Sequence, residues 1–283
     1  MVRGVTPILG ESAARQRFAG LLARPAVPLA EAALAIAEEE YPALPVGDYL
    51  ARLDVLGAAV GRKVGVRRAP ASPLRALREV LGEEERFRGN ADAYYDPRNS
   101  FLNEVLERRL GIPITLGVLY IEVAARAGLR LDGVGFPGHF LVKYAGGARE
   151  VFVDPFHGGE ILSADDCLAR FRERAPGLTL EARHLAAVGP RQILGRMLHN
   201  LKKIYVEAGD DVRALWVVDR LLILAPDDLA ERRDRGLVEA RLGGSTAALA
   251  DLEAYLAATP DAPDAVEVRA LAEQLRGRGS MLN

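Results

Sequence analysis

The chain has 283 residues, of which 49% are hydrophobic, and a formal net charge of −2 at pH 7. This is the composition of an ordinary soluble globular protein, long enough for one large domain or two smaller ones. Its near-neutral charge gives no case for nucleic-acid binding, and its longest apolar run, residues 114–121, is far too short to span a membrane. The N-terminus lacks the apolar segment of a signal peptide, and a single cysteine excludes an intramolecular disulfide, which fits a cytoplasmic protein.

The N-terminal part of the chain is predicted to be helical. Apolar residues recur at the spacing of a buried helix face in four segments, residues 11–22, 28–41, 49–63 and 74–81. The acidic run from Glu38 to Glu40 ends the second of these segments. We interpret this run as a solvated helix end rather than a site.

A turn and a short helix come next. Residues 96–100 (DPRNS) combine turn-forming residues with a helix cap, and they predict a helix from about Phe101 to Arg109. Asn99 and Asn103 are polar side chains near the start of this helix. Two interpretations of them stay open: they cap and solvate the helix, or they line a pocket near His139.

The following helix is predicted to be buried on nearly all sides. Gly111-Ile112-Pro113 ends the preceding helix and starts a new one with proline at an early position, and Gly128 ends it. Apolar side chains occupy both sides of this helix, and its first turn contains Thr115. A strand around Gly133–Phe136 follows, so the segment is typical of an α+β core.

A hairpin is predicted directly afterwards. Residues 140–144 (FLVKY) and 150–153 (EVFV) are short β-prone runs joined by a loop centred on Gly146-Gly147. The predicted register places Lys143 opposite Glu150, an opposite-charge pair, and His139 opposite Asp154. Directly opposed residues have Cβ atoms about 5 Å apart, so the imidazole and the carboxylate are expected to form a hydrogen bond.

Three motifs carry a resemblance to a known family. They read DPRNSFLNEVLERRLGIPITL, GVGFPGHFLV and FVDPFHGG. Together they resemble the transglutaminase-like superfamily, and most closely its bacterial SirB-like branch, over about residues 25–185. The resemblance implies a mostly helical, papain-type α+β core with a small antiparallel sheet. It also places His139 on the family's triad histidine and Asp154 on its triad aspartate.

The chain departs from that family at the nucleophile. Transglutaminase-like enzymes carry a cysteine at the N-terminus of the buried helix, where the helix dipole and the histidine lower its pKa. Here that region is Pro113-Ile114-Thr115, which offers at most a hydroxyl. The chain's single cysteine is Cys167, in a predicted helix after the hairpin, and we interpret it as a small buried apolar residue.

The C-terminal tail repeats itself. Ala225-Pro226-Asp227 returns as Thr259-Pro260-Asp261, and Gly209 returns as Gly243, in both cases after 34 residues. This period is typical of tetratricopeptide repeats. Because two such units are marginal alone, we expect them to dock on the first domain. The predicted division is a transglutaminase-like domain over residues 1–188 and helical repeats over 189–283.

Three functions follow from these motifs. The favoured one is a non-catalytic module that binds a protein or peptide through the repeats and a groove at His139. The second is an enzyme that hydrolyses or transfers an acyl group, with His139 and Asp154 activating water or Thr115. The third is metal-dependent chemistry in which His157 joins His139 and Asp154 as a two-histidine, one-carboxylate site. The favoured function needs no cofactor and no metal.

Overall fold

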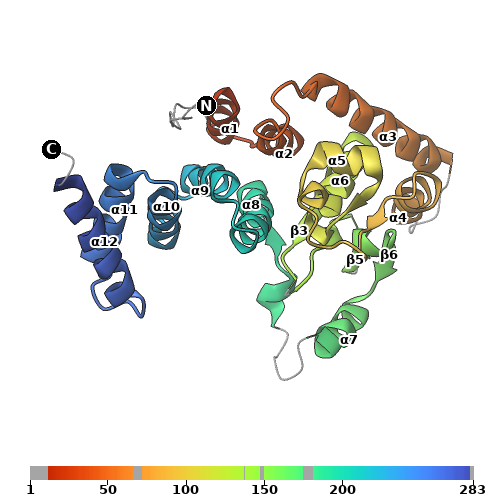
Figure 1. Cartoon of the computed structure of the whole chain (residues 1–283). Helices are drawn as coiled ribbons and strands as arrows, with labels where there is room; N and C mark the ends of the chain where they lie inside the picture. The colour runs from red at the N-terminus through yellow and green to blue at the C-terminus, as the bar shows by residue number, and fades with distance from the viewer. Residues whose placement is uncertain (1–11, 67–71, 137, 147–149, 175–180, 281–283) are drawn as a thin grey trace.

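The computed structural model describes residues 12–66, 72–136, 138–146, 150–174 and 181–280. The molecule is elongated, with a core of helices and a sheet at one end and a row of helices at the other (Figure 1). The predicted class, an α+β core followed by an all-helical tail, is confirmed. Gly147, at the predicted hairpin turn, lies outside the described residues. None of the described helices has the length and apolar character that crossing a membrane requires.

In the described part of the chain, six α-helices precede the larger sheet. Their bounds are α1 Ala13–Leu22, α2 Leu29–Ala37, α3 Val46–Val66, α4 Ser72–Leu77, α5 Leu102–Arg108 and α6 Pro113–Arg126. The predicted helix over 74–81 is only partly right, because α4 widens after Leu77 into a π-helical segment, Arg78–Glu84. Gly82 in this segment packs directly on Gly158, and a Cβ there would overlap the Gly158 carbonyl. The segment therefore supports the chain that follows Asp154.

Gly82 provides the first testable prediction. We expect Gly82→Ala to lower the free energy of unfolding by about 1–3 kcal/mol, because a rigid backbone carbonyl occupies the space of the new methyl group. The matched control is Gly61→Ala in α3, where nothing lies within 4 Å of the added Cβ. That change should stabilise the helix by about 0.5–1 kcal/mol. Chemical denaturation measures both, and equal effects would contradict the packing argument.

Among the described residues, the main sheet has five antiparallel strands in the order β6-β5-β4-β3-β7. Their bounds are β3 Leu131–Val134, β4 Leu141–Tyr144, β5 Val151–Asp154, β6 Glu160–Leu162 and β7 Ala187–Val188. A separate parallel pair joins β1 Arg88–Gly89 to β2 Leu110–Gly111. Helix α6 covers one face of the main sheet, and α7, Ala164–Arg174, packs on the other.

The strands alternate between these two faces, as period-2 geometry requires. Phe140, Val142 and Val153 belong to the core that contains α6. Leu141 and Phe152 belong to a smaller cluster with Phe171 and Cys167 of α7. Asp154 follows Phe152 by two residues and faces the same side as α7.

The predicted hairpin register is wrong by two residues. Val142 lies opposite Val153 and Lys143 opposite Phe152, because the connection from Tyr144 to Val151 is longer than the tight turn assumed. Lys143 nevertheless forms an ion pair with Glu150. A slip of two residues leaves every side chain on its original face, whereas a slip of one would move it to the other. The predicted contact between His139 and Asp154 therefore remains possible.

The tail forms the predicted repeats. Its helices are α8 Pro190–Glu207, α9 Asp211–Leu224, α10 Leu229–Arg241, α11 Ser245–Ala258 and α12 Ala265–Ser280. The matched glycines Gly209 and Gly243 follow α8 and α10 with φ of 68° and 85°, a conformation that favours glycine. Within the second pair, Gly236 lies against Leu252, so its missing side chain lets α10 and α11 pack closely.

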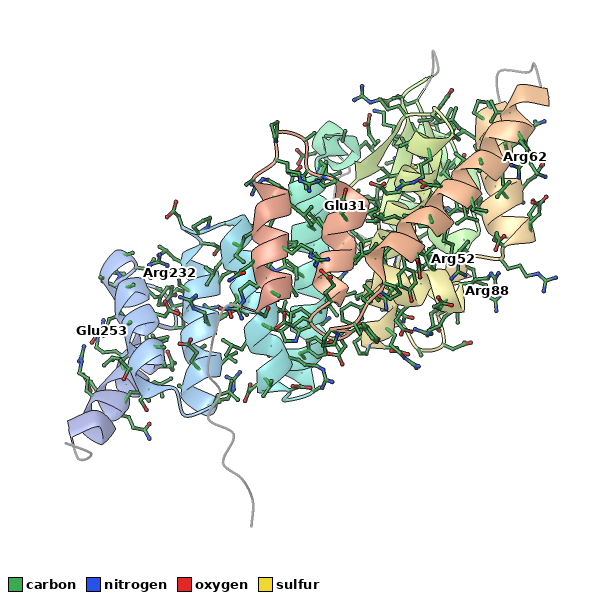
Figure 2. The ribbon with its side chains drawn as sticks, turned by 90° about the horizontal axis from the view of Figure 1, so that it is seen from above. Glu31, Arg52, Arg62, Arg88, Arg232 and Glu253 are labelled. Atoms are coloured by element: carbon green, nitrogen blue, oxygen red, sulfur yellow. The ribbon has the colours of Figure 1, made fainter. Side chains whose placement is uncertain are left out.

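The repeats dock on the N-terminal helices. Figure 2 shows α1 and α2 lying beside α8 and α9, and one hydrophobic cluster runs from Phe18 to Val238. The acidic run after α2 is not simply solvated, which corrects our interpretation. Glu39 pairs with Arg220 at 2.7 Å and Glu40 pairs with Arg213 at 2.7 Å. The repeats therefore dock on the N-terminal helices, as expected. The boundary between the two domains at residues 188 and 189 stays a prediction.

Candidate functional site

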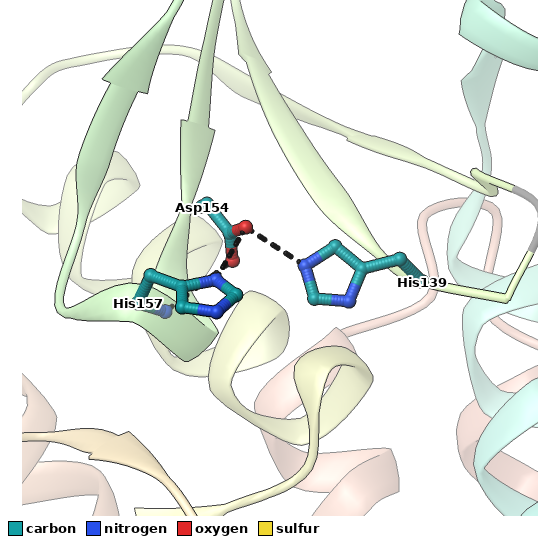
Figure 3. Close-up of side chains that lie close together, drawn as sticks. All are labelled: His139, Asp154 and His157. Atoms are coloured by element: carbon teal, nitrogen blue, oxygen red, sulfur yellow. Dashed lines mark hydrogen bonds and ion pairs between the residues drawn. The ribbon is translucent and has the colours of Figure 1, made fainter. Parts of the chain in front are cut away.

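His139 and Asp154 meet where two neighbouring strands end. His139 lies two residues before the start of β4, and its backbone N–H donates to the carbonyl of Phe136. Asp154 is the last residue of β5. The imidazole Nε2 lies 2.9 Å from the carboxylate Oδ2, and the two side chains are 5% and 0% exposed (Figure 3). Among the described residues, no hydrogen bond reaches Nδ1 of His139.

The Asp154 carboxylate has several further partners. Its Oδ2 lies 2.8 Å from Nδ1 of His157 and accepts a bond of 3.0 Å from Nη1 of Arg170. Its Oδ1 accepts from the backbone N–H groups of Phe156 and His157. Burial raises the pKa of this carboxyl, but hydrogen bonds and charge from His139 and His157 outweigh burial and bring it to about 2. Asp154 is therefore a carboxylate at neutral pH.

The first repeat helix holds the backbone of the histidine. Arg196 of α8 donates from Nη2 to the carbonyl of His139 at 2.7 Å and to that of Phe136 at 3.3 Å. Its guanidinium also lies over the ring of Phe140. Burial lowers the pKa of Arg196. The tail thus contributes directly to the position of His139.

Aromatic rings border the site. Phe156 packs edge-on to His139 with ring centroids 6.0 Å apart, and its other side meets the ring of Tyr94. It lies against Gly89, where a Cβ would overlap the ring. Phe136, by contrast, is buried against Phe171 on the α7 face of the sheet. Phe156, and not Phe136, therefore packs beside the ring of His139.

No activated nucleophile accompanies the pair among the described residues. Thr115 is fully buried in the first turn of α6, and its hydroxyl has no hydrogen-bond partner there. Cys167 is also fully buried, in the apolar cluster under α7, and burial raises the pKa of its thiol to about 11. A thiol with so high a pKa is protonated at neutral pH and is a poor nucleophile.

The two asparagines have different surroundings. Asn99 is fully buried and donates to the carbonyls of Ala93 and Tyr94 while accepting from Asn90, so it fixes the preceding turn. Asn103 is 3% exposed, and its Oδ1 has no hydrogen-bond partner among the described residues. Neither forms a hydrogen bond with His139 in the described part of the chain.

Three potential metal ligands do come together. One ligand atom each from His139, Asp154 and His157 lies within 4.8 Å of the others (Figure 3). The side chain of His157 is 42% exposed, so the cluster reaches the surface. Arg170 and Arg196 complete the surroundings, and sequence reasoning missed both. Each lies in a separate helix, and no local pattern links either one to the hairpin.

Comparison with known proteins agrees with this geometry. The family model described as "Transglutaminase-like superfamily" matches residues 47–199, and the one described as "Tetratricopeptide repeat" matches residues 201–273. A UPF0162 protein of Xylella fastidiosa is 40% identical over 247 residues, which cover 86% of this chain and 88% of that protein. The chain belongs to the UPF0162 family, within the transglutaminase-like superfamily. The predicted family and repeats are therefore confirmed.

More distant UPF0162 relatives and one eukaryotic group extend the comparison. The UPF0162 protein of Vibrio cholerae is 35% identical over 192 residues, covering 67% of this chain and 71% of that protein. Human F-box only protein 21 is 31% identical over 167 residues, covering 55% of this chain but only 26% of the human protein. No solved structure matches the chain.

Proposed function

We propose that this UPF0162 protein is a non-catalytic, cytoplasmic binding module that holds a segment of a partner protein. One observation carries the proposal: the triad-equivalent His139 and Asp154 are in place, yet neither Thr115 nor Cys167 is an accessible, activated nucleophile. An imidazole–carboxylate pair without a nucleophile still orients hydrogen-bonding groups. It does not supply the covalent step of thiol acyl transfer.

A groove between the first helices of the two repeats supports this function. It has a volume of about 320 Å³. Lys203 and Val206 of α8 line one wall, and Leu237 and Arg241 of α10 line the other. Repeat proteins bind partners on extended concave surfaces of this kind. The mixture of apolar and charged lining suits a peptide segment of a partner protein better than a small apolar ligand.

Photocrosslinking in living cells tests the proposal. We replace Val206, which is 45% exposed in the groove, with a photoreactive benzoylphenylalanine. Irradiation is expected to give one covalent adduct of defined mass, which Lys203→Glu should abolish. The matched control carries the same group at Val266, which is 71% exposed on α12 and outside the groove, and should give no such adduct.

Two outcomes would contradict the proposal. One is an identical adduct pattern from Val206 and Val266. The other is turnover of an ester or amide substrate that His139→Ala abolishes in a folded protein, which would favour the hydrolytic alternative. Removing all residues after 188 is not a usable variant. It would remove Ile193, Met197 and Leu201 of α8 from the main hydrophobic core, so a loss of binding could not be separated from a loss of folding.

A further inference from the structure

We propose that His139, Asp154 and His157 form a binding site for one divalent transition-metal ion. The candidate ligand atoms are Nε2 of His139, Nδ1 of His157 and Oδ2 of Asp154. Both imidazole nitrogens lie 2.8–2.9 Å from the same carboxylate oxygen, one on each side of it (Figure 3). The site is separate from the groove between α8 and α10 and does not depend on the function proposed for that groove.

The three atoms need only small movements to accept an ion. Zinc binds histidine nitrogen and carboxylate oxygen at about 2.0–2.2 Å, so its ligand atoms lie somewhat farther apart than hydrogen-bonded atoms. The ion would replace the two imidazole protons that now face Oδ2. Rotation of His157, whose side chain is 42% exposed, provides the required space and a path for the ion.

The surroundings already hold the ligands in place. Backbone N–H groups of Phe156 and His157 fix the other carboxylate oxygen, Oδ1. Arg196 fixes the backbone of His139 through its carbonyl. Outer hydrogen bonds of this kind orient metal ligands and contribute to affinity.

Charge decides which ion suits the site. Arg170 donates to Oδ2 and opposes a cation, but its guanidinium also pairs with Glu160 at 2.6 Å, so Glu160 balances its charge. Two imidazoles and one carboxylate favour zinc, iron or cobalt over calcium and magnesium, which prefer oxygen ligands. The exposed side chain of His157 leaves this side of the site accessible to water.

Metal titration of the full chain tests this site. After removal of metal by a chelator, the protein is titrated with zinc chloride by calorimetry and with cobalt chloride by visible absorption. We expect one ion per chain and a cobalt spectrum typical of nitrogen and oxygen ligands. The variant His157→Asn, whose amide can still donate to Asp154, should retain its melting temperature and bind zinc at least about tenfold more weakly.

Two further variants sharpen the test. Arg170→Gln removes the opposing charge and should tighten zinc binding by about tenfold. His199→Ala removes a histidine of α8 whose side chain is 55% exposed, and it should leave binding unchanged. Absence of stoichiometric zinc binding by the wild type, or equal affinity in the wild type and His157→Asn, would overturn the proposal.

Discussion

Asp154→Asn is expected to lower the free energy of unfolding by about 3–5 kcal/mol, because it removes one member of a buried ionic network. The carboxylate is completely buried and accepts hydrogen bonds from His157, Arg170 and two backbone amides, besides its bond to His139. Asparagine keeps the shape but loses the charge. It also presents an N–H₂ group to hydrogen-bond donors, so the contact with the partly buried Arg170 becomes unfavourable.

The pH dependence gives this prediction a second readout. The folded-state pKa of Asp154 is about 2, below the ordinary value of 3.8. Stability contributed by this carboxylate is therefore complete above about pH 4 and is lost as the pH falls toward 2. Chemical denaturation between pH 2 and 7 should show this loss in the wild type and a flatter profile in Asp154→Asn. The control is the exposed Asp166, where the asparagine variant should have a much smaller effect; equal effects would contradict the argument.

Arg220→Met is expected to destabilise the protein by about 3 kcal/mol and to loosen the contact between the N-terminal helices and the repeats. The Arg220 side chain is fully buried and pairs with Glu39, which also accepts a hydrogen bond from Ser12. Removing the arginine leaves a largely buried carboxylate without its cation. Amide hydrogen exchange should then increase in α1 and α2 before it increases in α6.

A neighbouring pair serves as the matched control. Arg213 and Glu40 join the same two regions, but the arginine side chain is 44% exposed. Arg213→Met should therefore cost no more than about 1 kcal/mol. The double variant Arg220→Met with Glu39→Leu should recover part of the lost stability, because it removes both buried charges. An equal cost for the two arginines would show that burial does not decide the effect.

Much of this structure follows from patterns within the sequence. The buried helix from Pro113, the repeats and the meeting of His139 with Asp154 were all predicted from periodicity, glycine positions and strand alternation. The hairpin register was not. A Lys143–Glu150 pair is compatible with more than one alignment because long side chains also reach diagonally, as they do here. The contact at Asp154 was still predictable because only the face of the strand had to be right.

Other parts of the site depend on contacts between distant segments. Arg170 and Arg196 reach the hairpin from helices that follow it, and neither position differs in sequence from an ordinary surface arginine. The ion pairs of Glu39 and Glu40 require α9 to lie against α2. The π-helical segment after α4 places Gly82 against Gly158, which is distant in the sequence. Tertiary packing determines all of these features, so they cannot be predicted from the local conformational propensities of the residues.

Helix α8 makes contact at two places. In its first half, Arg196 donates a hydrogen bond to the carbonyl of His139. Farther along the helix, Lys203 and Val206 form one wall of the groove. The helix is a single uninterrupted rod between these points. A tilt of α8 caused by a partner in the groove must therefore either move the backbone of His139 or break the hydrogen bond from Arg196 to its carbonyl. One rigid helix therefore joins a wall of the groove to the residue that fixes the backbone of His139.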